Sequence, residues 1–341
     1  METADQLDVL QGAAAARRGH LRLCAYVEGE GRQTDLDPER IGALLANRAN
    51  YLWLDVVDPG PVELDLLRRQ FRFHELALED VARRHQRPKC DTYEDGGYYF
   101  IVLYVGNHTA DEFVAEELEI FWGENYLVTI HDRPVDLFME VQRRWLRQPH
   151  HPTGLAYVVY TLFDAVIDGY LPLVDWIEER VEDVEERIFP RAAPDVASVI
   201  FQTRKQLVRM RRVLAPTRDV FNEIIRRDLP LYPESLRPYL VDVYDHTLRA
   251  LDQLDLYRDL LESALDVYLS ATSNYLNQLV KRMTALTLLI MAPTLIAGIY
   301  GMNFKDPIPG YDTHWGFLYS IGLMLLLTVG GVLVFRWLDW L

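Results

Sequence analysis

One long stretch of the chain, residues 266–303, joins a helical pattern to a membrane-length apolar segment. It begins in polar sequence and continues without a break signal into 18 uncharged residues, 283–300, enough to span a bilayer. Polar and small residues recur along it at steps of four and three, namely Asp266, Ser270, Ser273, Asn277, Thr284, Thr287, Met291, Thr294 and Gly298. This spacing predicts one seam of a helix, facing the symmetry axis of a parallel bundle.

The chemistry of the seam favours a pore. Hydroxyl groups in hydrocarbon need partners or water, so the seam indicates several copies of the helix around a narrow aqueous path. The alternative is that each Ser or Thr hydroxyl bonds back to its own helix. The recurrence of these positions in one register favours the pore.

A second apolar segment, residues 316–335, supplies 20 uncharged residues and predicts a second span. Lys281 and Arg282 precede the first span and Arg336 follows the second, so the N- and C-termini are predicted to be cytoplasmic. The predicted membrane domain is therefore 283–341, with spans 283–300 and 316–335 and a periplasmic loop 301–315 between them.

The residues before the first span predict a long stalk. No Pro or Gly interrupts the chain between Pro238 and Pro293, and a helix from Pro238 to Tyr300 would be about 90 Å long at 1.5 Å per residue. This exceeds any bilayer, so most of the helix is predicted to project into the cytoplasm. An acidic helix, 176–189, and a basic helix, 194–214, precede it and are predicted to pair as a hairpin. Residues 151–282 thus form a predicted domain of hairpin and stalk.

Residues 1–150 predict an α/β domain with a mixed sheet. Short aromatic and β-branched runs predict strands at 51–57, 98–105, 118–122 and 126–131. Helical patches lie between them at 61–71 and 75–84. Phosphate-binding glycine loops, the nucleophile elbow and HExxH are all absent from the sequence, so no enzyme is predicted.

Charge and cysteine content narrow the class of protein. The formal net charge is −16, and residues from 281 onward carry +1, which leaves −17 on residues 1–280. A body this acidic repels nucleic acid and concentrates cations. Cys24 and Cys90 are the two cysteines, without CxxC spacing, which indicates neither a disulfide framework nor a structural zinc site. The first 20 residues carry no pattern of a cleavable signal peptide.

Several short motifs surround the first span. The sequence AGIYGMNF at 297–304 follows the span, DVYLS stands at 266–270, and Pro293 lies inside the span. These motifs resemble the CorA family of magnesium channels, part of the two-span GxN superfamily. LEDVARRHQRPK at 78–89 and DVYDHT at 242–247 also resemble family segments. The resemblance covers nearly the whole chain.

The resemblance implies an α+β membrane protein of the cell inner membrane, assembled in lipid as a homopentamer, that admits Mg²⁺ and also Co²⁺ or Ni²⁺. The implied selectivity filter is Tyr300, Gly301, Met302 and Asn303, where five Asn303 amides hold the water shell of the ion. Pore-lining positions are Asn277, Val280, Met283, Thr287, Met291, Thr294 and Gly298. A regulatory Mg²⁺ is implied between Asp80 of one subunit and Asp242 of the next, with Glu79 and Asp266 as weaker candidates.

Two departures and two alternatives accompany this interpretation. The family loop close to Met-Pro-Glu-Leu is replaced by residues 305–312, so Asp306 or Asp312 becomes the candidate cation-attracting acid, and the basic C-terminal run is reduced to Arg336. A zinc transporter of the ZntB type would share the fold and topology. A membrane-anchored sensor would need the two spans only as a tether, but such a tether needs neither the hydroxyl seam nor Asn303.

Overall fold

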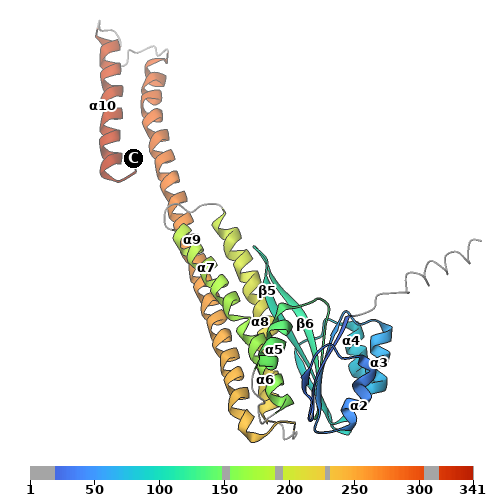
Figure 1. The fold of residues 1–341 in the computed structure, drawn as a ribbon. Coiled ribbons are helices and arrows are strands. Elements are labelled where there is room, and N and C mark those ends of the chain that lie inside the picture. Colours follow the sequence, from blue (N-terminus) through green and yellow to red (C-terminus); the bar gives the residue numbers. More distant parts are fainter. Residues whose placement is uncertain (1–19, 148–153, 189–194, 227–230, 303–314, 341) are drawn as a thin grey trace, which may run out of the picture. The chain divides into compact units, whose positions relative to one another are not determined.

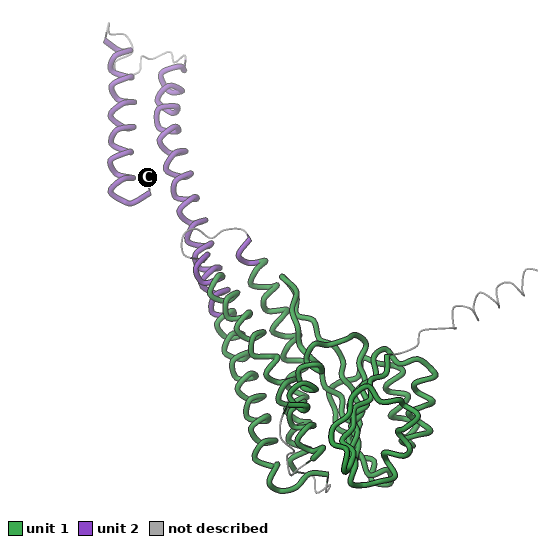
Figure 2. The backbone as a smooth tube through the Cα atoms, viewed as in Figure 1, with its two compact units in different colours: residues 1–183, 198–261 green, residues 184–197, 262–341 purple. Residues whose placement is uncertain are grey.

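The computed structural model describes residues 20–147, 154–188, 195–226, 231–302 and 315–340. The chain forms two compact units, one of residues 1–183 and 198–261, the other of residues 184–197 and 262–341 (Figure 2). The predicted domains 1–150 and 151–282 thus fall largely together in the first unit. Helix α9 contributes residues to both units.

The first unit contains a seven-stranded mixed sheet in the order β2-β1-β3-β7-β6-β5-β4. Strands β3 and β7 pair in parallel, and all the other neighbours are antiparallel. The strands are β1 (His20–Val27), β2 (Gly31–Gln33), β3 (Tyr51–Val57), β4 (Lys89–Tyr93), β5 (Tyr98–His108), β6 (Phe113–Trp122) and β7 (Tyr126–His131). The predicted mixed sheet is confirmed.

Two predicted strands are longer than their sequence patterns indicate. Strand β6 begins at Phe113 rather than at 118, and β5 continues to His108 rather than ending at 105. The two strands pair along their whole lengths, from Tyr99 opposite Trp122 to His108 opposite Phe113. The cross-strand ladder therefore extends the strands through polar residues that a strand pattern leaves out.

Helices cover both faces of this sheet (Figure 1). One face packs against α2 (Ile41–Ala46), α3 (Pro61–Phe71) and α4 (Glu75–Arg83), whose apolar residues share a core with the strands. The other face packs against α5 (Asp136–Arg147) and α6 (Leu155–Asp168), through contacts such as Trp53 with Phe138 and Trp122 with Phe163. The sheet is thus buried on both sides, which explains its long apolar runs.

Helices α7 (Leu171–Ile188) and α8 (Val196–Arg226) correspond to the predicted acidic and basic helices. Two arginines of the basic helix form ion pairs outside the predicted hairpin. Arg211 bonds Asp255 of α9 at 2.8 Å, and Arg209 pairs with Glu112 beside β6 at 3.5 Å. Charge on α8 therefore links the helix to the stalk and to the sheet.

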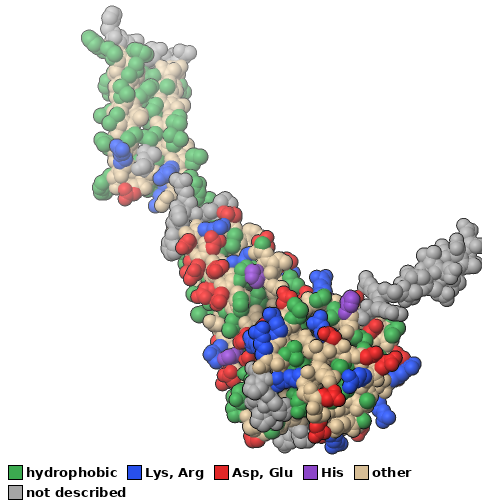
Figure 3. Space-filling model, in the orientation of Figure 1, with side chains coloured by type: hydrophobic (Ala, Val, Ile, Leu, Met, Phe, Trp, Pro, Cys, Tyr) green, Lys and Arg blue, Asp and Glu red, His purple; other side chains and the backbone are tan. Residues whose placement is uncertain are grey.

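The second unit contains the C-terminal part of α9 (Arg237–Tyr300) and α10 (Gly316–Trp337), as Figure 1 shows. Three helical stretches of the described chain are long and apolar enough to cross a membrane. In the first, 155–188, 61% of the apolar window is buried inside the protein, whereas the figures for the windows in α9 and α10 are 11% and 6%. Figure 3 shows hydrophobic side chains over these last two helices. The predicted spans, 283–300 of α9 and 316–335 of α10, are therefore the apolar segments whose surfaces remain exposed and suited to lipid.

One buried carboxyl group in the sheet makes stability depend on pH. Glu119 of β6 is fully buried, and its carboxylate oxygens have no hydrogen-bond partner among the described residues. Burial, reinforced by Glu117, raises the pKa of Glu119 from about 4.5 to about 8. Below pH 8 the folded chain keeps this proton, while the unfolded chain loses it above pH 4.5. Stability should therefore fall as the pH rises through that window.

We expect Glu119→Gln to remove this pH dependence, because glutamine has the same shape and does not ionise. The substitution should be nearly neutral at pH 5 and should stabilise the first unit by on the order of 3 kcal/mol at pH 8. Thermal unfolding of the full chain in detergent at both pH values measures the difference. The control is Glu116→Gln, on the opposite face of the same strand. An equal effect of Glu119→Gln at both pH values would contradict the prediction.

Candidate ion pathway and metal sites

The predicted pore-lining seam lies on an open face of α9. Its seven members, 277, 280, 283, 287, 291, 294 and 298, are all exposed in the single chain. On the opposite face of the helix, Ala285 is fully buried and Ile296 is 7% exposed. A Cβ added at Gly331 of α10 would lie 2.8 Å from Leu289 Cδ2, so a residue without a side chain allows the two helices to approach closely. Helix α10 therefore covers one face and leaves the seam free.

The hydroxyl groups of the seam bond back to their own helix. The Oγ1 atoms of Thr287 and Thr294, and that of Thr284 outside the seven positions, each donate to the carbonyl oxygen four residues earlier, at 2.8 Å. For these three threonines, the alternative that the hydroxyl group bonds back to its own helix is confirmed. Each oxygen still carries lone pairs, so the exposed threonines are acceptors toward the open side of the helix.

A shallow groove of about 690 Å³ runs along the C-terminal end of this face. It is lined by Thr287, Ile290, Met291, Thr294, Leu295, Gly298, Ile299 and Met302. At its end the helix stops at Tyr300, and the Gly301 amide donates to the Ala297 carbonyl at 2.9 Å. A Cβ at Gly301 would lie 3.1 Å from that oxygen, so glycine is favoured here by close packing. Asn303, the central predicted filter residue, lies outside the described residues.

Asp80 lies on α4 and forms an ion pair with a lysine. Lys89 Nζ, at the start of β4, lies 2.7 Å from Asp80 Oδ2 and 2.5 Å from Asp91 Oδ2. Burial lowers the pKa of Lys89, but the hydrogen bonds to the two carboxylates outweigh it and leave the pKa raised. Glu79, the neighbouring candidate, pairs with Arg83 at 2.6 Å. Both acids thus have cationic partners within the chain.

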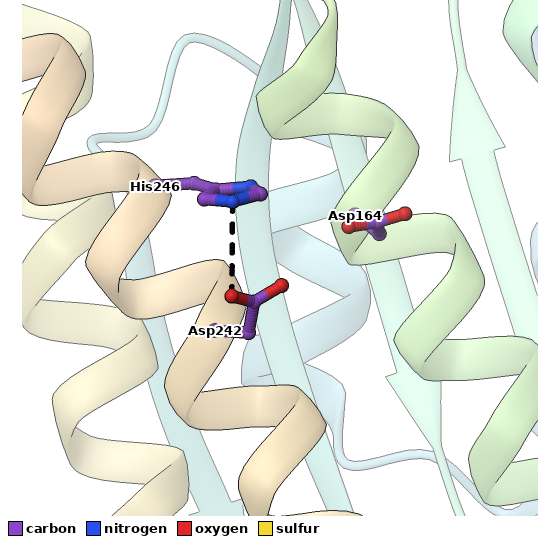
Figure 4. Close-up of side chains that lie close together, drawn as sticks. All are labelled: Asp164, Asp242 and His246. Atoms are coloured by element: carbon purple, nitrogen blue, oxygen red, sulfur yellow. Dashed lines mark ion pairs between the residues drawn. The ribbon is translucent and has the colours of Figure 1, made fainter.

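Asp242 belongs to a different cluster, on the face of α9 that meets α6. Ligand atoms of Asp164, Asp242 and His246 all lie within 4.8 Å of one another (Figure 4). His246 Nε2 is 3.7 Å from Asp242, and its Nδ1 is 3.9 Å from Asp168. Burial raises the pKa of Asp164, and the nearby Asp168 raises it further. In the part of the chain that the structure describes, this is the one such group of three ligands.

The family model described as "CorA-like Mg²⁺ transporter protein" matches residues 48–336 of the chain. The chain belongs to this family. The cobalt/magnesium transport protein CorA of Thermotoga maritima is 31% identical over 85% of this chain and 83% of its own length. The solved CorA magnesium transporter of Methanocaldococcus jannaschii, 24% identical, has the same fold, with a TM-score of 0.79 over 92% of this chain and 97% of that one.

The zinc alternative receives less support from the comparisons. The zinc transport protein ZntB of Pectobacterium carotovorum is 23% identical over 90% of this chain and 91% of its own. Identity to the T. maritima CorA protein is higher. The CorA interpretation is thus supported over the ZntB one. Membership of a transporter family also favours transport over the alternative of a membrane-anchored sensor.

The metal candidates named from the CorA resemblance are only partly brought together. Asp80 and Glu79 lie on α4, Asp242 lies in the α6–α9 cluster, and Asp266 is exposed farther along α9. Sequence reasoning missed Asp164 and His246. The spacing of four between Asp242 and His246 places both on one helix face and could have indicated His246. Nothing in the sequence pairs Asp164 with them, because α6 and α9 meet only in the fold.

Proposed function

We propose that this chain forms a homopentameric channel in the cell inner membrane that admits Mg²⁺, and also Co²⁺ or Ni²⁺, into the cytoplasm. The observation that carries the proposal is the orientation of α9. Its predicted pore-lining seam is exposed, whereas the opposite face contains the buried Ala285 and Ile296 and approaches α10 at Leu289. Five copies arranged around the seam would enclose a path lined by the same seven positions, with α10 outside, toward lipid.

The seam suits an ion that keeps its water shell. Mg²⁺ gives up its waters reluctantly, and those waters donate hydrogen bonds outward. Because Thr287 and Thr294 have donated their own hydrogens to α9, their oxygens accept. At the outer end, a ring of Asn303 amide oxygens, with carbonyls of Tyr300 and Gly301, would hold the hydrated ion without a fixed charge. The neutral filter keeps binding weak enough for release.

Closure is proposed to combine an apolar constriction with a cytosolic sensor. Rings of Met283 and Met291, which are 65% and 55% exposed in the single chain, would close the path by dewetting. A regulatory Mg²⁺ held by Asp80 of one subunit and Asp242 of the next would favour the closed state. Asp164 and His246, beside Asp242, would add ligands to that ion.

The driving force is the membrane potential, with the N- and C-termini in the cytoplasm. A potential of 100 mV, negative inside, supplies about 2.3 kcal/mol per charge, and about twice that for a divalent ion. The acidic body, at −17 over residues 1–280, would attract the ion toward the cytoplasmic side. No catalytic step is proposed.

Ion flux into proteoliposomes tests the function. Liposomes holding the full chain are loaded with a divalent-ion indicator and exposed to Mg²⁺, Co²⁺, Ni²⁺ or Zn²⁺, with and without an imposed potential. We expect Mg²⁺ entry that rises with an inside-negative potential. Zinc entry that depends on a proton gradient, with no Mg²⁺ entry, would favour the ZntB alternative. No flux of any ion would contradict a channel.

The outer loop supplies a further prediction. Asp306 and Asp312 stand where the family has a glutamate, and both lie outside the described residues. If they concentrate cations at the mouth, Asp306→Asn with Asp312→Asn should slow uptake at low Mg²⁺, with less effect at high salt because screening removes the field. Uptake rates at two ionic strengths measure this. The same rate as the unmodified chain at low ionic strength would show that other groups provide the field.

A further inference from the structure

We infer that Lys89 is a resident cation of the regulatory site, which competes with Mg²⁺ for Asp80 and sets the concentration at which the site fills. The inference rests on the proposed regulatory role of Asp80. The two residues should have opposite effects on Mg²⁺ binding at the site. Removal of Asp80 should weaken the binding, and removal of Lys89 should strengthen it.

The ammonium group lies between two carboxylates. Lys89 Nζ is 2.7 Å from Asp80 Oδ2 and 2.5 Å from Asp91 Oδ2, so an ammonium group already occupies the space between the two carboxylates. A divalent ion that binds Asp80 must either displace this ammonium or bind beside a like charge. Both alternatives weaken its binding.

The lysine is held in this position from two sides. It is the first residue of β4 and pairs with Val102 of the neighbouring strand β5, which fixes its backbone. Its ammonium also lies 5.2 Å from the ring centroid of Phe100, a fully buried residue. Its side chain is only 30% exposed. The Lys89 side chain is therefore held in a defined position beside Asp80, unlike a mobile lysine on the surface.

The three side chains open onto a polar groove of about 1280 Å³. Besides Asp80, Lys89 and Asp91, its charged lining residues are Arg87, Glu94, and Asp219 and Glu223 of α8. Among the described residues, Arg87 forms no ion pair with Asp80 or Asp91, whereas Lys89 bonds both, so these two acids would bind Mg²⁺ at lower concentration without Lys89. Lys89 reduces the local negative charge and the repulsion between the carboxylates when no Mg²⁺ is bound. It therefore raises the Mg²⁺ concentration at which the site is half occupied.

The test is a Mg²⁺ titration of protease protection, using the full chain in detergent. Lys89→Met keeps the aliphatic length and removes the charge, and should lower the Mg²⁺ midpoint about fivefold, as expected for one partly exposed ion pair. Lys89→Arg should keep the midpoint close to that of the unmodified chain. The matched control is Arg69→Met, which breaks an ion pair of 2.7 Å with Asp65 on α3, away from the groove.

Two further variants keep the inference falsifiable if Lys89→Met does not fold. Asp91→Asn leaves the ammonium to Asp80 alone and should raise the midpoint. In an Asp80→Asn background, the effect of Lys89→Met should disappear, because the two residues act on one ion. If Asp80→Asn raises the Mg²⁺ midpoint but Lys89→Met raises it or leaves it unchanged, the inference about Lys89 is wrong. The proposed sensor at Asp80 would then still stand. If Asp80→Asn has no effect either, the sensor proposed at Asp80 fails and this inference fails with it.

Discussion

Replacing Asn303 with alanine should reduce Mg²⁺ uptake to the level of empty liposomes. The substitution removes the proposed ring of amide oxygens that holds the hydrated ion, and no neighbouring side chain of the Gly-Met-Asn motif can replace it. Assembly should be unaffected, because α9 approaches α10 at Leu289, on the face opposite the seam. Indicator-loaded proteoliposomes measure uptake, and size-exclusion chromatography measures assembly.

A matched control separates loss of the amide from a general effect on the helix. Asn274→Ala makes the same chemical change at an exposed position of α9 that lies off the seam. It should leave uptake unchanged. Uptake by Asn303→Ala at the rate of the unmodified chain would refute the filter assignment. Loss of assembly in that variant would show that the motif acts on packing.

Combining Asp80→Asn with Asp242→Asn should abolish the inhibition of uptake by internal Mg²⁺. The two residues lie in separate clusters of one chain, so a shared ion requires two subunits. The double change removes the ion and also the repulsion between the carboxylates, so the fold should be little affected. We expect currents that no longer fall as internal Mg²⁺ rises through the low-millimolar range, and weaker Mg²⁺ protection from protease.

The two clusters can be separated by single changes. Asp164→Asn removes one acid of the α6–α9 group and leaves Asp80 with Lys89. If the ion is held mainly by that group, Asp164→Asn should shift the midpoint as strongly as Asp242→Asn. Asp65→Asn, which removes an exposed acid of α3 that pairs with Arg69, is the control. Inhibition of the double variant with the midpoint of the unmodified chain would exclude both residues as the sensor and direct attention to the acidic part of α7.

Secondary structure in this protein was largely predictable where one strong pattern acts alone. The strands 51–57 and 126–131 and the helix 61–71 agree with the structure at both ends, because Gly, Pro and Asn bound their apolar runs. The helix predicted from Pro238 to Tyr300 is observed from Arg237 to Tyr300. In such segments the local propensities and the tertiary contacts favour the same conformation.

The predictions were less complete where partners decide the conformation. The first residues of β6 become strand because β5 pairs with them, and Arg209 and Arg211 of α8 bond Glu112 and Asp255, which lie outside the hairpin. The apolar stretch 155–188 has the hydropathy of a span, but 61% of its apolar window is buried inside the protein. Hydropathy alone does not distinguish burial in protein from burial in lipid.

The sequence by itself determined the two spans, the long helix, the mixed α/β domain and the family, since these follow from periodicity, length and a motif of contiguous residues. The tertiary structure decided which face of α9 meets α10, that Lys89 neutralises Asp80, and that Asp164 joins Asp242 and His246. The physical reason is the range of the interactions. Periodicity records the local geometry of one helix or strand, whereas an ion pair or a ligand cluster depends on side chains far apart in the chain that only packing brings within a few ångströms.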